Sequence, residues 1–151
     1  MNPVAGPSRR VGIDVGGTKA QGVALDADGA VVATVQQPTP RGDGSLESLI
    51  EIMASIATEL EAADGVGVGV PGLVTRSGVL RAAPNLDGVA DFAIGPLLSD
   101  RLGLAVSVDN DATCATVAEW RLGVATGCDD VVLVTLGTGI GGGLVADGVL
   151  H

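Results

Sequence analysis

Apolar residues follow two spacings along this chain, one typical of strands and one typical of helices. Between residues 45 and 60 they recur every three or four positions, which predicts an amphipathic helix. Two further helices are expected over about residues 91–102 and 111–122. Short apolar runs bounded by glycine, proline or aspartate predict strands. These runs cover about residues 10–15, 20–26, 30–37, 66–70, 105–108 and 131–136.

The order of these elements predicts an α/β fold in which helices flank a mixed sheet. Three strands come first as a meander, with a turn at Asp26–Gly29, and helices and strands then alternate. A short hairpin is expected around Arg76–Gly78. Ser45 is placed to cap the first helix, and Glu47 in its first turn suits the helix dipole.

Composition refines this picture. The 151 residues are 46% hydrophobic but only 1% aromatic, so the core must consist of Val, Leu, Ile and Ala. This length allows one domain, or one domain and part of another. Two glycine-rich segments each follow an apolar strand and precede a hairpin, which suggests two related lobes. We therefore expect a flexible leader over residues 1–9, a lobe over 10–125 and the beginning of a second lobe over 126–151.

Charge excludes several classes of partner. The net charge is −10, which argues against general binding to nucleic acid and to anionic membrane surfaces. No apolar run is long enough to span a membrane, and Asp14 interrupts the stretch after Arg10, so a signal peptide is not expected. A cytoplasmic location follows as the expectation. Cys114 and Cys128 lack metal-ligand spacing and are expected to be buried free thiols.

The segment from Asp14 to Lys19, with the sequence DVGGTK, carries the chemistry of a phosphate site. Gly16 and Gly17 let backbone N–H groups approach an anion. Thr18 and Lys19 add a hydroxyl donor and a positive charge, and the Asp14 carboxylate can hold Mg²⁺ directly or through water. The alternative is a tight hairpin turn without a ligand, because short glycine motifs have many false positives.

A second glycine-rich segment spans Gly137–Gly143 and fits the G-x-G-x-x-G spacing. A dinucleotide site also needs a helix after the glycines, whereas the residues that follow indicate a hairpin. We therefore predict a second phosphate loop, with a glycine-rich turn without a ligand as the alternative.

Between these segments, Asp109, Asn110 and Asp111 lie at a strand end and a helix start. Asp109 or Asn110 could cap that helix. An aspartate there could instead accept a proton from a hydroxyl as it attacks phosphorus. Gly72 and Asn85, each considered alone, are ordinary turn and loop residues.

Together, and in this order, these motifs resemble the ROK family (repressors, open reading frames and kinases), most closely its bacterial glucokinases. The resemblance runs from about Val11 to His151. It is carried by the segments DVGGTK (14–19), GVPG (69–72), PNL (84–86), DNDA (109–112) and GTGIGGG (137–143).

The resemblance implies a ribonuclease-H-like, actin-like ATPase lobe and the start of a similar second lobe. It implies an ATP- and Mg²⁺-dependent transfer of phosphate to the 6-hydroxyl of a hexose, such as glucose, with Asp111 as the general base. ATP phosphates would be bordered by Asp14, Gly16, Gly17, Thr18 and Lys19, and from the second lobe by Thr138 and Gly139. Asp14 would hold Mg²⁺ through phosphate or water. Sugar hydroxyls would contact Gly72, Asn85, Asn110 and Asp111.

The sequence also departs from the family pattern. Thr113 stands where many members have Asn. Family members continue past this point with residues that supply further sugar ligands, and many also carry a cysteine-rich zinc motif. Neither the sugar ligands nor the zinc ligands are present in these 151 residues, so this chain alone is expected to be inactive. A homodimer is implied for the full-length protein. The sugar stays open among glucose, N-acetylmannosamine, N-acetylglucosamine, fructose and allose, and the donor between ATP and polyphosphate.

A sugar-sensing ROK regulator, or a non-catalytic sugar-binding module, is the alternative function. Regulators of the family carry a helix-turn-helix ahead of this region and tend to lose the phosphate-loop residues. Here about ten residues precede the first strand, and Asp14–Lys19 is intact. The sequence therefore favours the kinase.

Overall fold

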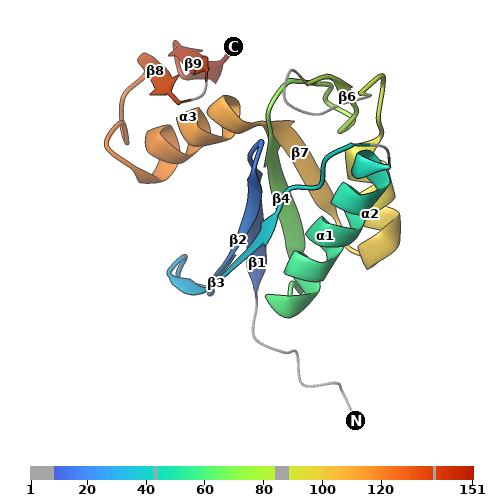
Figure 1. The fold of residues 1–151 in the computed structure, drawn as a ribbon. Coiled ribbons are helices and arrows are strands. Elements are labelled where there is room, and N and C mark those ends of the chain that lie inside the picture. Colours follow the sequence, from blue (N-terminus) through green and yellow to red (C-terminus); the bar gives the residue numbers. More distant parts are fainter. Residues whose placement is uncertain (1–8, 43, 84–88, 138) are drawn as a thin grey trace. The chain divides into compact units, whose positions relative to one another are not determined.

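The computed structural model describes residues 9–42, 44–83, 89–137 and 139–151. It divides into two compact units, an amino-terminal unit that ends at Asp109 and a carboxy-terminal unit from Asn110 to His151. Both units combine strands with helices, which confirms the predicted α/β class (Figure 1).

A mixed sheet forms the centre of the amino-terminal unit, with the strand order β3-β2-β1-β4-β7. Strand β1 runs antiparallel to β2 and parallel to β4, and β2 runs antiparallel to β3. The predicted strands are confirmed and differ from the observed ones only at their ends. Their bounds are β1 (Arg10–Val15), β2 (Lys19–Leu25), β3 (Val31–Pro38), β4 (Gly65–Val70) and β7 (Val106–Asn110).

Helices α1 (Ser45–Glu59) and α2 (Ile94–Leu102) pack against each other, and α1 covers the sheet (Figure 1). Leu49, Met53 and Ile56 of α1 are fully buried against the valines and isoleucine of β1 and β4. Gly22 of β2 lies under this helix, and a Cβ there would come within 2.3 Å of Ile56. The core is aliphatic, as the composition predicts.

The start of α1 differs from the prediction. Gly44 is the N-cap, in the left-handed conformation with φ 72°, and no side chain caps the helix. The cap predicted for Ser45 is therefore wrong: Ser45 is buried as the first helical residue, and its N–H donates to the Gly42 carbonyl. Glycine takes this left-handed position without Cβ strain. Helix α2 also begins later than predicted, at Ile94.

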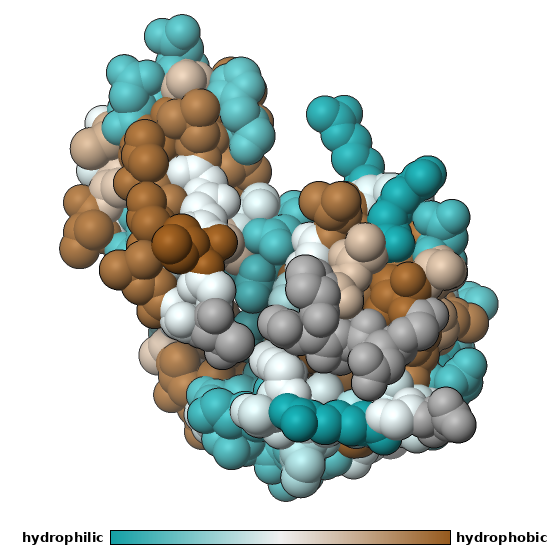
Figure 2. Space-filling model, turned by 45° about the horizontal axis from the view of Figure 1, so that its top comes forward, coloured by the Kyte–Doolittle hydropathy of each residue, from teal (hydrophilic) through white to brown (hydrophobic). Residues whose placement is uncertain are grey.

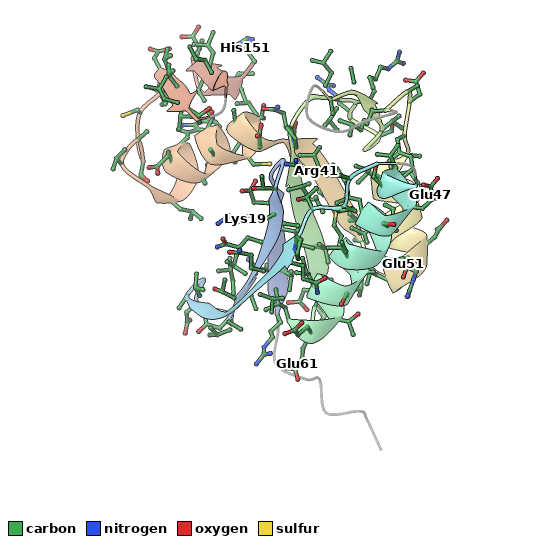
Figure 3. All side chains as sticks on the ribbon, viewed as in Figure 1. Lys19, Arg41, Glu47, Glu51, Glu61 and His151 are labelled. Atoms are coloured by element: carbon green, nitrogen blue, oxygen red, sulfur yellow. The ribbon has the colours of Figure 1, made fainter. Side chains whose placement is uncertain are left out.

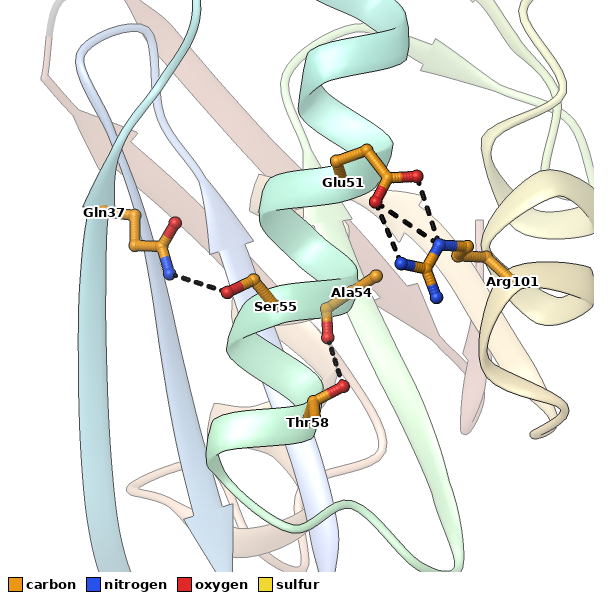
Figure 4. Close-up of polar contacts among 6 residues, drawn as sticks. All are labelled: Gln37, Glu51, Ala54, Ser55, Thr58 and Arg101. Carbon is orange, nitrogen blue, oxygen red and sulfur yellow. Dashed lines mark hydrogen bonds and ion pairs between the residues drawn. The ribbon is translucent and has the colours of Figure 1, made fainter.

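Glu51 on α1 and Arg101 on α2 form a two-pronged ion pair at the surface (Figure 4). Arg101 Nη2 donates to Glu51 Oε2 over 3.0 Å, and Arg101 Nε donates to Oε1 over 3.1 Å. These hydrogen bonds, and the charge of the guanidinium, hold the pKa of Glu51 below its ordinary value of 4.5. The same contacts raise the pKa of Arg101.

Neutralising this pair should remove a small, pH-dependent part of the stability. Because the pKa of Glu51 is lowered in the folded state, the contribution is present above pH 4.5 and is lost as the pH falls through the lowered value. Urea unfolding of Glu51→Gln should therefore give a slightly reduced free energy at neutral pH and no difference in acid. The effect is small because both side chains are exposed. If Glu51→Gln and Arg101→Gln had fully additive effects, the pair would contribute nothing.

The short strands β5 (Leu73–Val74) and β6 (Leu80–Ala82) form the hairpin predicted around Arg76–Gly78. Leu80 pairs with Phe92 through two backbone hydrogen bonds. Gly78 contacts Gly95 at the start of α2, where the Gly95 N–H donates to the Gly78 carbonyl over 2.9 Å. The hairpin is therefore fixed to α2 near the end of β4.

The carboxy-terminal unit contains α3 (Asp111–Leu122) and an antiparallel sheet of β8 (Val131–Leu136), β9 (Ile140–Ala146) and β10 (Val149–Leu150). Helix α3 packs on this sheet through glycines. A Cβ on Gly141 would lie 3.0 Å from Ala112 Cβ, and one on Gly143 would lie 2.3 Å from Thr116 Oγ1. The predicted loop over residues 137–143 is thus too long, because Gly141–Gly143 lie in β9. Gly141 and Gly143 face α3, where a Cβ would come too close to the helix.

The expected burial of the cysteines is wrong, because Cys128 is exposed and Cys114 is half-buried. Trp120 of α3 is buried, and its Nε1 donates to the Cys128 carbonyl over 2.9 Å. Helix α3 packs against β8 and β9, so the division after Asp109 differs from the boundary expected after residue 125. None of the described helices is long and apolar enough to cross a membrane.

One face of the β8–β9 sheet carries exposed apolar side chains. Val132, Val134 and Leu136 of β8 alternate with half-buried residues, and Ile140 of β9 adds to the same set. Figure 2 shows apolar surface on the carboxy-terminal unit. The alternation predicts that the other face of this sheet is the one covered by α3.

Candidate active site

The predicted phosphate loop is the turn that joins β1 to β2. The Gly16 N–H donates to the Lys19 carbonyl over 2.8 Å, which closes the turn. A Cβ on Gly16 would lie 3.1 Å from that carbonyl oxygen, so the close backbone approach favours glycine. Asp14, Thr18 and Lys19 are all exposed. Asp14 lies near the end of β1, Thr18 lies in the turn and Lys19 begins β2, so the acidic, hydroxyl and basic residues of the motif border one turn.

The backbone N–H groups of this loop suit an anion. Within the described residues, the N–H groups of Gly17 and Thr18 donate to no acceptor. Successive N–H groups of a tight turn that face solvent form an anion-binding concavity. The loop is thus a tight hairpin turn, which was the alternative interpretation of the sequence, and phosphate binding at this turn stays a prediction.

Lys19 begins β2, and its ammonium reaches toward β3 (Figure 3). Nζ donates to Gln36 Oε1 over 3.4 Å, which is a long and therefore weak hydrogen bond. The exposed side chain can leave this contact at little cost. Its role opposite a phosphate stays a prediction.

Two residues that the sequence did not single out, Thr39 and Arg41, contact the loop from the segment after β3. Thr39 Oγ1 donates to the Gly16 carbonyl over 2.7 Å, and the Thr39 N–H donates to the Thr18 carbonyl over 3.0 Å. Arg41 Nη2 donates to the Gly17 carbonyl over 2.8 Å, at the tip of the β1–β2 hairpin (Figure 3). The described carbonyl groups at the tip of the loop are therefore held by this one segment.

Gly72 lies just beyond β4, at the same edge of the sheet as the phosphate loop. Strands β1 and β4 are parallel, with Asp14 opposite Gly69, so both end at this edge. Gly72 has φ 126°, and a Cβ there would lie 2.1 Å from the Ala82 carbonyl oxygen. Backbone conformation and space both require glycine here. Asn85 lies outside the described residues, so its sugar contact stays a prediction.

Asn110 and Asp111 mark the end of β7 and the start of α3. Asn110 is the N-cap, and its Oδ1 accepts the Thr113 N–H over 3.1 Å. The capping role that the sequence left open between Asp109 and Asn110 is taken by Asn110. Asp111 is exposed, and its Oδ1 accepts the Ala112 N–H over 2.8 Å. No described residue donates a hydrogen bond to Asp111 Oδ2.

The loop between β8 and β9 is shorter than the glycine pattern predicts, because β9 begins at Ile140. The Gly137 N–H donates to the Gly139 carbonyl over 2.9 Å, which makes a tight turn. Thr138 lies outside the described residues, so the phosphate contacts of Thr138 and Gly139 stay predictions. Helix α3 packs on β9, and this unit therefore contains both Asp111 and the second glycine turn.

The candidate residues thus fall into two groups. Asp14–Lys19 and Gly72 lie at one edge of the amino-terminal sheet, while Asn110, Asp111 and Gly139 lie in the carboxy-terminal unit. Across the described ranges, no three or more His, Cys, Asp or Glu side chains gather in a way that could hold a metal ion. A metal at Asp14 would therefore need ligands from a bound phosphate or from water.

Comparison with known proteins identifies relatives over nearly the whole chain. The sequence matches the ROK family over residues 10–151. The glucokinase of Halalkalibacterium halodurans is 35% identical over 150 residues, which cover 93% of this chain and 45% of that protein. A ROK family glucokinase from Streptomyces griseus, solved with glucose and AMPPNP, superposes with a TM-score of 0.85 at 31% identity. That match covers 95% of this chain and 46% of the other.

A ROK family transcriptional regulator, homologous to the E. coli MLC protein, also shares the fold. It superposes with a TM-score of 0.82 at 24% identity, over 96% of this chain and 38% of its own. The chain spans about half the length of the curated relatives it matches. The resemblance drawn from the motifs is confirmed, and so is the actin-like ATPase fold, which the sugar-kinase structures share.

Proposed function

Because this chain belongs to the ROK family, we propose that it carries the phosphate loop and the general base of a hexose kinase. The reaction is the ATP-dependent phosphorylation of a hexose 6-hydroxyl, with glucose as the expected sugar. The observation that carries the proposal is the β1–β2 loop, where the N–H groups of Gly17 and Thr18 bond to no other described residue. These donors suit the phosphates of a nucleotide, and the relatives compared above include glucokinases.

The residues present fit ATP and Mg²⁺. Backbone N–H groups at the loop suit phosphate oxygens, and the exposed Asp14 carboxylate near the end of β1 suits the metal. Mg²⁺ in kinases is commonly held by one or two carboxylates together with substrate phosphates and water. A single aspartate is therefore an adequate protein ligand. When bound, ATP supplies the transferred phosphoryl group, and Mg²⁺ neutralises its charge.

Asp111 would act as the general base. As the 6-hydroxyl oxygen of the sugar forms its bond to the γ-phosphorus, the bond from phosphorus to the ADP oxygen breaks and the hydroxyl proton moves to Asp111 Oδ2. The Ala112 N–H holds Oδ1, so the orientation of the carboxylate is fixed. An aspartate is a weak base toward a free hydroxyl, but it becomes effective as the hydroxyl acidifies during attack.

Sugar contacts are proposed for Asn110, Gly72 and Asn85. The cap bond to Thr113 fixes the side-chain amide of Asn110, so this group is held rigidly beside Asp111. Gly72 would contribute backbone groups, since it has no side chain. Rigid positioning of the reacting hydroxyl is a main source of rate in phosphoryl transfer, where the protein does little covalent chemistry.

A sugar panel on the protein at its natural full length tests the proposal. Coupled ADP release would be followed with glucose, mannose, fructose, allose, N-acetylglucosamine and N-acetylmannosamine, each with ATP and Mg²⁺. We expect turnover with at least one hexose and the highest kcat/KM with glucose. A parallel series with polyphosphate as the donor should give lower kcat/KM than ATP.

A DNA-binding measurement on the same full-length protein distinguishes the kinase from the sugar-sensing regulator. If no sugar in the panel stimulated phosphate transfer and the protein retained a labelled operator DNA specifically, the kinase proposal would be replaced by sugar sensing. Glucose turnover without specific DNA retention would support the kinase.

A further inference from the structure

We propose that Thr39 and Arg41 are positioning residues, which hold the phosphate loop so that its N–H groups face the nucleotide phosphates. The inference rests on the proposed function, because it concerns the same loop. Thr39 and Arg41 follow directly after β3 and lie outside every motif identified in the sequence.

Three consecutive carbonyl groups of the loop each accept one hydrogen bond from Thr39 or Arg41. The carbonyl of Gly16 accepts from Thr39 Oγ1, that of Gly17 accepts from Arg41 Nη2, and that of Thr18 accepts from the Thr39 N–H. Their lengths are 2.7, 2.8 and 3.0 Å, which is the range of well-formed hydrogen bonds. Consecutive peptide groups of the loop are therefore held by one short segment.

Peptide geometry converts these bonds into an orientation of the N–H groups. A trans peptide is planar, and its C=O and N–H bonds point in opposite directions. The structure has no cis peptide bond among the described residues. Holding the Gly16 carbonyl therefore directs the Gly17 N–H away from Thr39, and holding the Gly17 carbonyl directs the Thr18 N–H away from Arg41. These are the two N–H groups that bond to no other described residue.

The loop needs such restraint because of its glycines. Gly16 and Gly17 allow a close approach to phosphate, but they also allow each peptide plane to rotate at little steric cost. Thr39 is buried, so its hydroxyl bond is sheltered from water. Arg41 is a charged donor, which bonds more strongly than a neutral one and polarises the Gly17–Thr18 peptide toward a stronger N–H donor.

Calorimetric titration of variants at the natural full length tests the inference, with ADP, tripolyphosphate and adenosine as probes. Thr39→Val removes the hydroxyl at nearly constant shape, and Arg41→Gln removes the charge from an exposed position. We expect Kd for ADP and tripolyphosphate to rise roughly three- to tenfold for Thr39→Val and roughly tenfold or more for Arg41→Gln. Adenosine, which lacks phosphate, should bind unchanged. Thr39→Ser keeps the hydroxyl and should restore binding.

Arg10→Ala is the matched control, because it removes an exposed positive charge at the opposite end of β1. The inference is overturned if Arg41→Gln binds ADP like the unchanged protein, if adenosine weakens in parallel with ADP, or if neither ADP nor tripolyphosphate binds the unchanged protein. The proposed function fails separately: binding of ADP that depends on Arg41, without phosphorylation of any sugar, would leave the inference intact and remove the kinase.

Discussion

Replacing Asp111 with asparagine or alanine in the full-length protein is expected to abolish sugar phosphorylation and leave sugar binding largely intact. The loss in kcat should be roughly 10²- to 10⁴-fold, which is the usual contribution of a general base. Asparagine keeps the shape and can still accept the Ala112 N–H, but it cannot take up the hydroxyl proton. The measurement is kcat from coupled ADP release, together with glucose affinity from calorimetry.

Glu47→Gln is the matched control for Asp111. Both acids lie in the first turn of a helix and both are exposed, and Glu47 is labelled in Figure 3. The control therefore reports the loss of a favourable charge–dipole interaction alone. Its kcat should equal that of the unchanged protein. If Asp111→Asn retained kcat within a few-fold, or if sugar affinity fell as much as kcat, the base assignment would be wrong.

The sequence predicts most of the fold because side-chain spacing is a local property. Leu49, Met53 and Ile56 recur at helical intervals, and these residues fill the interface between α1 and the sheet. The second glycine-rich segment is the main exception. Gly141–Gly143 resemble part of a loop, yet they lie in β9. Helix α3 packs closely on this strand, and a Cβ on Gly143 would lie 2.3 Å from Thr116 Oγ1. Contacts of this kind are non-local and leave no periodic signal.

The residues of the candidate site could be predicted only in part, because some of its contacts are also non-local. Asp14–Lys19 is a contiguous motif, but Thr39 contacts it from 23 residues away through the pairing of β2 with β3. In the β2–β3 pair Lys19 lies opposite Pro38, so Thr39 comes next to the loop. Pairing the two predicted strands about the Asp26–Gly29 turn would have predicted this position for Thr39. The contact of Arg41 could not have been predicted from strand pairing, because it depends on the side-chain rotamer that reaches the Gly17 carbonyl.

Replacing Gly72 with alanine is expected to destabilise the protein and to raise the KM for the sugar more than the KM for ATP. Gly72 has φ 126°, and a Cβ would lie 2.1 Å from the Ala82 carbonyl oxygen and 2.9 Å from Ala83 Cα. Backbone strain alone costs about 1–3 kcal/mol, and the clash forces the backbone near Ala82 to move. That segment leads directly to the residues that include Asn85, so the predicted sugar contacts would shift together.

Gly67→Ala separates this effect from the general consequence of adding a methyl group. Gly67 lies in β4, close to Gly72 in sequence, but no heavy atom lies within 4 Å of a Cβ placed there. Urea unfolding should show Gly67→Ala to be as stable as the unchanged protein or slightly more stable, since alanine reduces the freedom of the unfolded chain. Nucleotide affinity should survive in both variants, because the phosphate loop lies on β1 and β2. Normal stability and a normal sugar KM in Gly72→Ala would show that neither the strain nor the sugar contact is real.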